Sequence, residues 1–143
     1  GSEAPGFPYQ VGDKIQSAPA ILDVDGQKVI FAGSNDNNLY AINSDGSLRF
    51  SILTGDNVNT SPSFIDINGN LYVMFGSKDD NVYAVDMDGN SLPGWPITLN
   101  GNIEGEIMSN RKLSDIIEKK DNSLLFLIFS CYYGLNSIEL YCT

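Results

Sequence analysis

The chain has 143 residues and contains no histidine, although serine, cysteine, tyrosine and many aspartates are present. Histidine is the usual general base near neutral pH and the commonest zinc ligand, so its absence removes both roles. Serine hydroxyls and cysteine thiols then lack the base that normally activates them as nucleophiles. The sequence therefore predicts no catalytic residues, and we expect the protein not to be an enzyme.

Two aspartate-rich segments contain the residue types that bind calcium. They are residues 23–26 (Asp-Val-Asp-Gly) and residues 66–69 (Asp-Ile-Asn-Gly). Calcium takes about six to eight oxygen ligands, usually with a later acidic residue that completes the shell. Lys28 and Leu71 stand where that residue would help. We therefore interpret both segments as tight turns and predict no metal site.

Two other polar segments and one aromatic residue could also contact ligands. Residues 35–38 and 78–81 are rich in Asn and Asp, and we interpret them as hairpin loops. Trp95 could be a platform on which a sugar stacks. Its Gly-Trp-Pro segment matches Gly-Phe-Pro at residues 6–8, and Phe50 occupies the corresponding place between them. This recurrence favours a packing role for Trp95 at the outer edge of a sheet.

These segments belong to an internal repeat of about 44 residues. Residues 15–46 shifted by 43 positions fall on residues 58–89, with 11 identities in 32 positions. Self-similarity at such a period is typical of repeated supersecondary units. The identical pairs are Pro19/Pro62, Asp23/Asp66, Gly26/Gly69, Gly33/Gly76, Ser34/Ser77, Asp36/Asp79, Asn38/Asn81, Tyr40/Tyr83, Ala41/Ala84, Asp45/Asp88 and Gly46/Gly89.

Turn residues divide each repeat into four strands. Asp-Gly and Asn-Gly pairs suit tight hairpins, because glycine accepts positive φ and Asp or Asn tolerates it. In the first repeat the pattern predicts strands over residues 18–23, 28–33, 38–43 and 48–53. Short strands joined by tight turns form an antiparallel, up-and-down sheet.

Both faces of these sheets must be covered. Residues 29–32 and 71–75 are uninterrupted apolar runs, which indicate strands buried on both sides. Stacked blades of a β-propeller provide such burial. Gly33 and Gly76 end the runs, where we expect the backbone to pass close to a neighbouring blade or to the central channel. The predicted fold is all-β, with two full four-stranded propeller blades and a degenerate third.

The repeat resembles a known family. The resemblance rests on residues 17–26 (Ser-Ala-Pro-Ala-Ile-Leu-Asp-Val-Asp-Gly), 32–34 (Ala-Gly-Ser), 39–42 (Leu-Tyr-Ala-Ile) and the Gly-Trp-Pro ending. Over about residues 5–105, the chain resembles the quinoprotein-type (PQQ-like, WD40-like) propeller repeats of bacterial extracellular proteins. This family includes scaffolds, adhesins, protease-attached domains and dehydrogenases, so the resemblance implies the fold and not one function. The chain lacks a ligand set that matches the quinone dehydrogenases, and we expect no cofactor.

The repeat sets the domain boundaries. Residues 1–14 are the end of a preceding blade, residues 15–57 are the first blade, and residues 58–102 are the second. The opening Gly1-Ser2 resembles a scar of tag removal, so a natural leader could have been cut away. The resemblance implies an extracellular or cell-surface location.

Residues 103–143 fit the repeat less well, and three alternatives remain. With an inserted segment, strands near residues 116–118, 124–130 and 137–141 would form a degenerate third blade. Residues 110–120 could instead form a short amphipathic helix. The segment could also be an unrelated tail docked on a blade. Its only cysteines, Cys131 and Cys142, allow a disulfide without implying one.

Composition limits the partners. The net charge of −10 repels phosphate backbones, so we expect no nucleic-acid binding. No apolar run reaches the roughly 18 residues of a membrane span. Two or three blades cannot close a ring of about four to eight. We therefore expect apolar sheet faces at both ends, covered by other copies of the chain or by the remaining blades of a longer chain.

We expect a non-catalytic binding or scaffolding module that contacts protein or glycan through its surface loops. The alternative is a purely structural, self-assembling propeller fragment without a ligand. A fragment of a quinoprotein-like enzyme is a third hypothesis.

Overall fold

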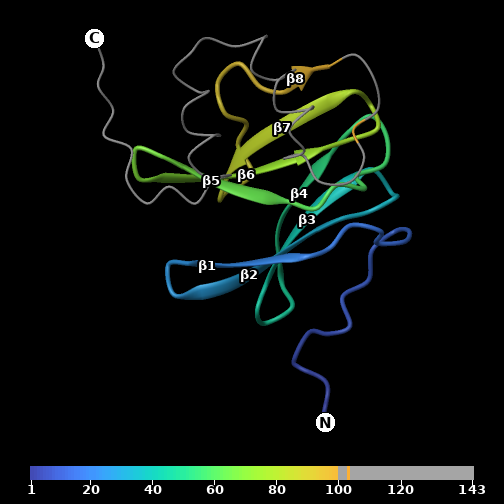
Figure 1. The fold of residues 1–143 in the computed structure, drawn as a ribbon. Helices are drawn as coiled ribbons and strands as arrows, with labels where there is room; N and C mark the ends of the chain where they lie inside the picture. The colour runs from blue at the N-terminus through green and yellow to red at the C-terminus, as the bar shows by residue number, and fades with distance from the viewer. Residues whose placement is uncertain (100–102, 104–143) are drawn as a thin grey trace.

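The structure, a computed structural model, describes residues 1–99 and residue 103. Within them the chain forms two antiparallel sheets of four strands, each in chain order, and no helix (Figure 1). We call the sheet of β1–β4 blade 1 and the sheet of β5–β8 blade 2. The strands are β1 (Ala20–Val24), β2 (Gln27–Gly33), β3 (Asn38–Asn43), β4 (Leu48–Leu53), β5 (Ser63–Ile67), β6 (Asn70–Gly76), β7 (Asn81–Asp86) and β8 (Ile97–Thr98).

The all-β prediction with four-stranded blades is confirmed. The bounds of β3 and β4 are those expected from the sequence, and β2 begins one residue early. The first strand was predicted to start at residue 18, but β1 begins at Ala20. The reason is local: Pro19 has no N–H to donate, and the Ala18 N–H donates to Ser61 Oγ at 3.2 Å.

Tight turns connect the first two strands of each blade. Asp25 and Gly26 both have positive φ, at 53° and 79°, as do Asn68 and Gly69, at 54° and 80°. Two consecutive residues with positive φ are the signature of the turn that matches the twist of a β-hairpin. The repeated Asp-Gly and Asn-Gly pairs therefore form the hairpin turns that the sequence predicted.

The fourth strands of the two blades differ. In blade 1, five residue pairs join β4 to β3, with a register shift between Ala41 and Ile42. In blade 2, Ser91 bridges to Val85, and the chain then loops outward before the short β8 pairs with Asn81 and Val82. The two extra residues between the aromatic positions 50 and 95 thus lie in this loop.

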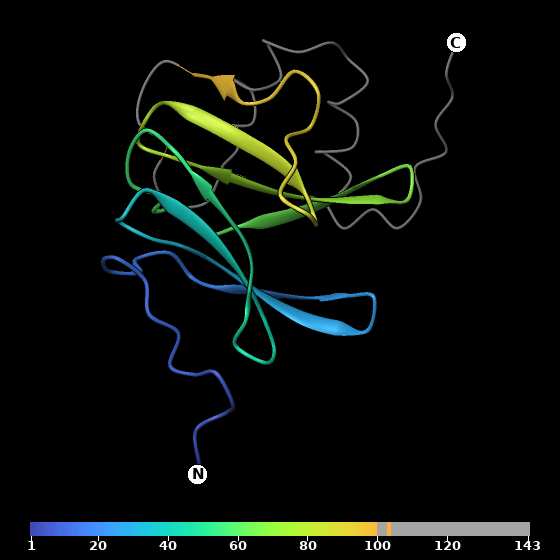
Figure 2. The ribbon, with the colours of Figure 1, turned by 180° about the vertical axis from the view of Figure 1, so that it is seen from behind.

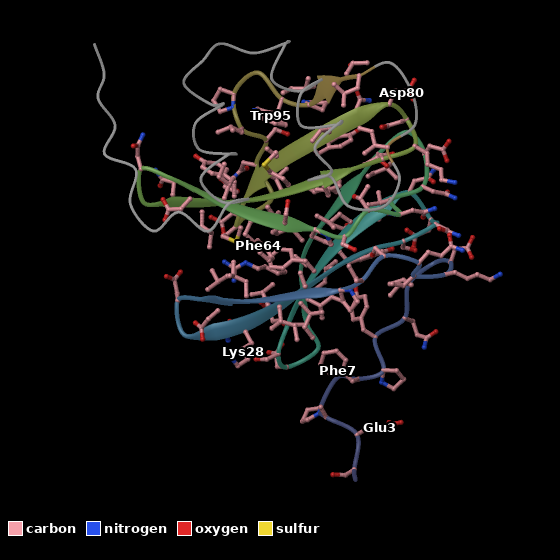
Figure 3. The ribbon with its side chains drawn as sticks, in the orientation of Figure 1. Glu3, Phe7, Lys28, Phe64, Asp80 and Trp95 are labelled. Atoms are coloured by element: carbon pink, nitrogen blue, oxygen red, sulfur yellow. The ribbon has the colours of Figure 1, made fainter. Side chains whose placement is uncertain are left out.

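The two blades stack face to face (Figure 2). Phe64 of blade 2 meets Phe31 of blade 1, with ring centroids 5.2 Å apart and an edge-on arrangement. Figure 3 shows Phe64 between the two sheets. Phe31, Val73 and Phe75 are fully buried in the shared core. Val73, Met74 and Phe75 of β6 are buried on both faces of blade 2, which matches the continuous apolar run of this strand.

The two strand-ending glycines lie where the backbone of the next repeat passes close by. A side chain on Gly33 would collide with the backbone and side chain of Val58, the first residue of the second repeat. A side chain on Gly76 would likewise collide with Ile103. The predicted close approach at both glycines is confirmed, and Ile103 occupies the position that the repeat assigns to the start of a third copy.

The outward faces of the two blades differ in exposure. On the outward face of blade 2, the apolar residues Ile65, Met74, Val82 and Ala84 are all buried. Ile103 packs at the edge of that face, on Gly76. On the outward face of blade 1, Ile21 and Leu48 are exposed, whereas Ile42 is buried. The predictions for residues 104–143, including Cys131 and Cys142, lie outside the described residues.

Candidate functional site

The aspartates that suggested calcium are held in turns. Asp23 Oδ1 accepts a hydrogen bond from the Gly26 N–H at 2.9 Å, and Asp66 Oδ1 accepts one from Gly69 at 2.8 Å. Each carboxylate thus closes the hairpin that its own glycine makes possible. Within residues 1–99 and 103, no three acidic or thiol side chains are grouped to hold a metal ion.

The loops at residues 35–38 and 78–81 carry a carboxylate that joins one repeat to the next. Asp36 Oδ2 accepts from the Gly12 N–H at 2.7 Å and from the Tyr40 hydroxyl at 2.8 Å. Its Oδ1 accepts from the Asn38 N–H at 3.1 Å. We call this arrangement the carboxylate brace. It fixes the segment that enters the blade to the hairpin between β2 and β3.

Blade 2 repeats the brace. Asp79 Oδ2 accepts from the Gly55 N–H at 2.7 Å and from the Tyr83 hydroxyl at 2.6 Å, and Asp79 Oδ1 accepts from Asn81 at 3.0 Å. Gly55 lies in the segment that leaves blade 1, so this brace ties the two blades together. The two braces are 43 residues apart at every position.

Burial and these hydrogen bonds shift the acidity of the brace groups. Partial burial opposes the charge of Asp36, but hydrogen bonds from Tyr40, Asn38 and Gly12 outweigh it and lower its pKa below 3.8. Burial, with the hydrogen bond to Asp36, raises the pKa of Tyr40 to about 12. The same causes lower the pKa of Asp79 and raise that of Tyr83. The braces are therefore ionised carboxylates with neutral tyrosines, which suits a structural role.

Two buried hydroxyls hold the strand-ending glycines. Ser17 Oγ accepts from the Gly33 N–H at 2.9 Å and donates to the Gly33 carbonyl at 3.1 Å. Thr60 Oγ1 makes the same pair of bonds with Gly76, at 2.8 and 2.9 Å. These hydroxyls are satisfied by the backbone on both sides. We assign them to the fold and not to nucleophilic chemistry.

Trp95 is a core residue. Its side chain is only 8% exposed and belongs to the cluster that includes Val85 and Ile97 (Figure 3 labels Trp95). A sugar platform needs a ring face open to solvent, which a buried tryptophan does not offer. The packing role expected from the repeat fits this burial.

One surface feature of the described residues that could accept a ligand is a groove over the hairpins of both blades. Its volume is about 490 Å³. We call it the acidic groove, because five carboxylates and no basic side chain line it. Its lining residues are Asp23, Val24 and Asp25 from blade 1, and Asp66, Gly69, Asn70, Leu71, Tyr72, Asp86, Met87 and Asp88 from blade 2.

The acidic groove combines charge with apolar surface. Asp86 is held ionised: partial burial opposes its charge, but hydrogen bonds from Asn90, Asp88 and Gly89 lower its pKa. Arg49 lies beside the groove, with its Nη2 atom 3.5 Å from Asp88 and its Nε donating to the Met87 carbonyl. Tyr72, Leu71 and Met87 supply hydrophobic contact area. This arrangement suits a cationic or hydroxyl-rich ligand.

Sequence reasoning identified the turn aspartates but not the groove or the braces. Asp23 and Asp66 come together only because the two blades stack with their hairpins side by side. The brace did leave a signal, since the spacing Asp-x-Asn-x-Tyr occurs in both repeats. No helix among the described residues has the length and apolar character needed to cross a membrane.

Comparison with known proteins gives no family. No protein-family model matches the chain, and none of the curated proteins matches it. Among solved structures, the crystal structure of the computationally designed Ika4 protein is similar, with a TM-score of 0.48 and 18% identity. BamB from Moraxella catarrhalis is similar with a TM-score of 0.33 and 15% identity. The alignments cover 71% and 64% of this chain, and 56% and 39% of those proteins.

Proposed function

We propose that the chain is a non-catalytic β-propeller module that binds a protein or glycan through the loops around the acidic groove. One observation carries the proposal: five carboxylates surround a groove that also offers Tyr72, Leu71 and Met87. Carboxylates attract cationic side chains and accept hydrogen bonds from sugar hydroxyls, while the apolar residues supply contact area. The charges favour a basic segment of a partner protein over a neutral glycan.

The non-catalytic part of the proposal rests on how the reactive side chains are used. The carboxylates of Asp36 and Asp79 accept hydrogen bonds that join the repeats. The hydroxyls of Ser17 and Thr60 bond to buried glycine backbone. A group held in this way is satisfied in the ground state and has no partner that would activate it.

A titration tests the binding proposal. We would follow the backbone amide signals of the full chain by NMR while adding a tetralysine peptide, and in parallel screen the chain on a glycan array. We expect shifts for Asp25, Asn70 and Asp88, and weaker binding as salt is added. The double variant Asp25→Asn/Asp88→Asn should lose the shifts. Asp45→Asn, which removes a charge from a turn outside the groove, should keep them. Absence of binding to peptide and glycans would contradict the proposal.

A purely structural propeller segment is the second candidate. The exposed apolar face of blade 1 favours it, because such a face is expected to pack against another blade. A structural segment would bind neither the peptide nor any glycan. A dehydrogenase fragment is a weaker alternative, which absorbance of a bound quinone and quinone-dependent dye reduction would reveal.

We also propose that the chain is a quinoprotein-type repeat protein of bacterial extracellular or cell-surface type. The support is the repeated Asp-Gly turns, the Gly-Ser and Tyr-Ala pairs, and the Gly-Trp-Pro ending, all placed on propeller-type blades. An alignment of related chains that kept these positions would support this assignment.

A further inference from the structure

One face of blade 1 is apolar and partly exposed. The four large hydrophobic residues that are exposed in the described part of the chain are Ile15 (47%), Ile21 (63%), Leu48 (47%) and Leu53 (72%). Ile21 pairs with Ile30, Ile30 with Ile42, and Ile42 with Leu48, so an aliphatic row crosses all four strands. The ends of this row are exposed, whereas Ile42 is 5% exposed. We call this surface, with Ile15 and Leu53, the open face. A patch of this kind marks an interaction site.

Blade 2 shows what covers such a face. The row equivalent to Ile21, Ile30, Ile42 and Leu48 is Phe64, Val73, Val85 and Ser91, joined by the same pairings. Val73 and Val85 are fully buried, and Phe64 packs on Phe31 of blade 1. The row is therefore covered by a neighbouring blade where one is present. In blade 1 the same positions carry equally apolar side chains, and the two at the ends of the row, Ile21 and Leu48, are exposed.

Ile15 matches a specific contact of this interface. The repeat places Ile15 at the position of Val58 and Ile103, which are 0% and 1% exposed. Val58 fills the space beside Gly33, and its N–H donates to the Ser34 carbonyl at 3.0 Å. Ile103 does the same at Gly76 and Ser77. By its position in the repeat, Ile15 is therefore expected to pack on the strand-ending glycine of another blade.

The segment before blade 1 already makes the contacts of a connection between blades. The Gly12 N–H donates to Asp36, as Gly55 does to Asp79. The Lys14 carbonyl accepts from the Asn35 N–H, as Asn57 does from Lys78. Residues 7–11 then correspond to residues 50–54, which contain most of β4. No strand among the described residues pairs with residues 7–11, and Phe7 lies on the side of blade 1 away from blade 2 (Figure 3).

We propose that the open face binds one further blade of the same repeat type. This partner blade contributes three strands of its own, and residues 7–11 add to it as the fourth strand. Its second strand ends in a glycine, and Ile15 packs on that glycine. The occupant is not a second copy of the chain, because Val58 and Ile103 already fill the sites at Gly33 and Gly76 in every copy. Strand addition supplies backbone hydrogen bonds, and the apolar row supplies the packing. The inference does not depend on the acidic groove.

The test supplies the partner blade by duplication. A copy of residues 15–46 is placed before Ala4 of the full chain. This keeps the native spacing, because residue 4 is equivalent to residue 47 in the repeat, and residue 47 follows residue 46 in the native chain. Ile21→Cys of the original blade 1 reports on the open face, in chains whose two native cysteines are serine. We expect thiol labelling at this position to slow by about tenfold or more when the copy is added. Amide exchange of residues 8–11 should slow as well, and this second readout can be measured with the native cysteines.

A matched control places Gly33→Ile in the added copy alone. That side chain would occupy the site for Ile15, so the protection of residues 8–11 and of the thiol introduced at position 21 should be lost. Unchanged labelling and exchange in the duplicated chain would overturn the proposal. A dimer of the unextended chain that becomes monomeric with Ile21→Asp would also overturn it, because a second copy would then cover the face. Monomeric unextended chain, with protection on duplication, is the result that we expect.

Discussion

Val58 occupies the space into which a side chain at Gly33 would project, with its Cγ1 atom 2.6 Å from that position. The pair joins the end of β2 in blade 1 to the first residue of the second repeat. Ile103 stands in the same relation to Gly76, which is 43 residues further along the chain. The contact between consecutive repeats is therefore encoded by a glycine in one repeat and a β-branched residue at the start of the next.

Gly33→Ala tests this contact. The added methyl group meets both the backbone and the side chain of Val58, so neither can move without disturbing the interface. We expect the free energy of unfolding to fall by about 1–3 kcal/mol, as for overpacked cores. Urea unfolding followed by circular dichroism measures it. Ser51→Ala, on an exposed position of β4, is the control and should change stability by less than about 0.5 kcal/mol.

Thr60→Val tests the buried hydroxyl. Valine has nearly the shape of threonine but leaves the Gly76 N–H and carbonyl without the partner that Thr60 Oγ1 provides. We expect a loss of roughly 2 kcal/mol, the cost of unsatisfied buried polar groups. Thr60→Ser is the matched control, since Ser17 makes the same two bonds in the first repeat. Equal stability of the valine and serine variants would show that the hydroxyl contributes nothing.

The carboxylate brace is tested by a double-mutant cycle on Asp36 and Tyr40. Asp36→Ala removes the acceptor of the Gly12 N–H and the Tyr40 hydroxyl, and Tyr40→Phe removes one of those donors. Because the pair is partly solvated, we expect about 1–2 kcal/mol for Asp36→Ala and a coupling of about 0.5–1 kcal/mol. Strict additivity of the two variants in urea unfolding would argue against a direct bond.

The pH dependence of stability follows from the same groups. The pKa values of Asp36, Asp79 and Asp86 are lowered in the folded chain, so their contribution is present above the unfolded value and lost as pH falls through the folded one. We expect stability to be flat between about pH 5 and pH 8 and to fall below about pH 4. Asp36→Asn should flatten part of that decline. An unchanged profile in this variant would contradict the assigned cause.

Much of the fold could be predicted from the sequence because its turns and repeats are explicit. The glycines of the Asp-Gly and Asn-Gly pairs adopt positive φ as expected, and the identity of Gly33 with Gly76 located the close contact between repeats. The short β8 was not predicted. The spacing of the repeat shows that two residues are added before Trp95, but it does not show where the chain leaves the sheet.

The candidate site was less predictable. The acidic groove gathers Asp25 from one blade and Asp88 from the other, and this neighbourhood depends on how the hairpins stack. The sequence also could not separate aspartates that close turns from aspartates that brace the blades. Asp23 and Asp36 both lie in polar segments rich in Asp, Asn or Gly. Asp23 nevertheless accepts a hydrogen bond within its own turn, whereas Asp36 accepts one from the distant Gly12.

The central claim is that the two repeats form equivalent sheets that stack through Phe31 and Phe64. Nuclear Overhauser effects measured on the full chain test it most directly. The account predicts contacts between the Phe31 and Phe64 rings, together with matching cross-strand contacts between Ile21 and Ile30 and between Phe64 and Val73. Cross-strand backbone contacts between a strand of the first repeat and one of the second, as in a single continuous sheet, would contradict it.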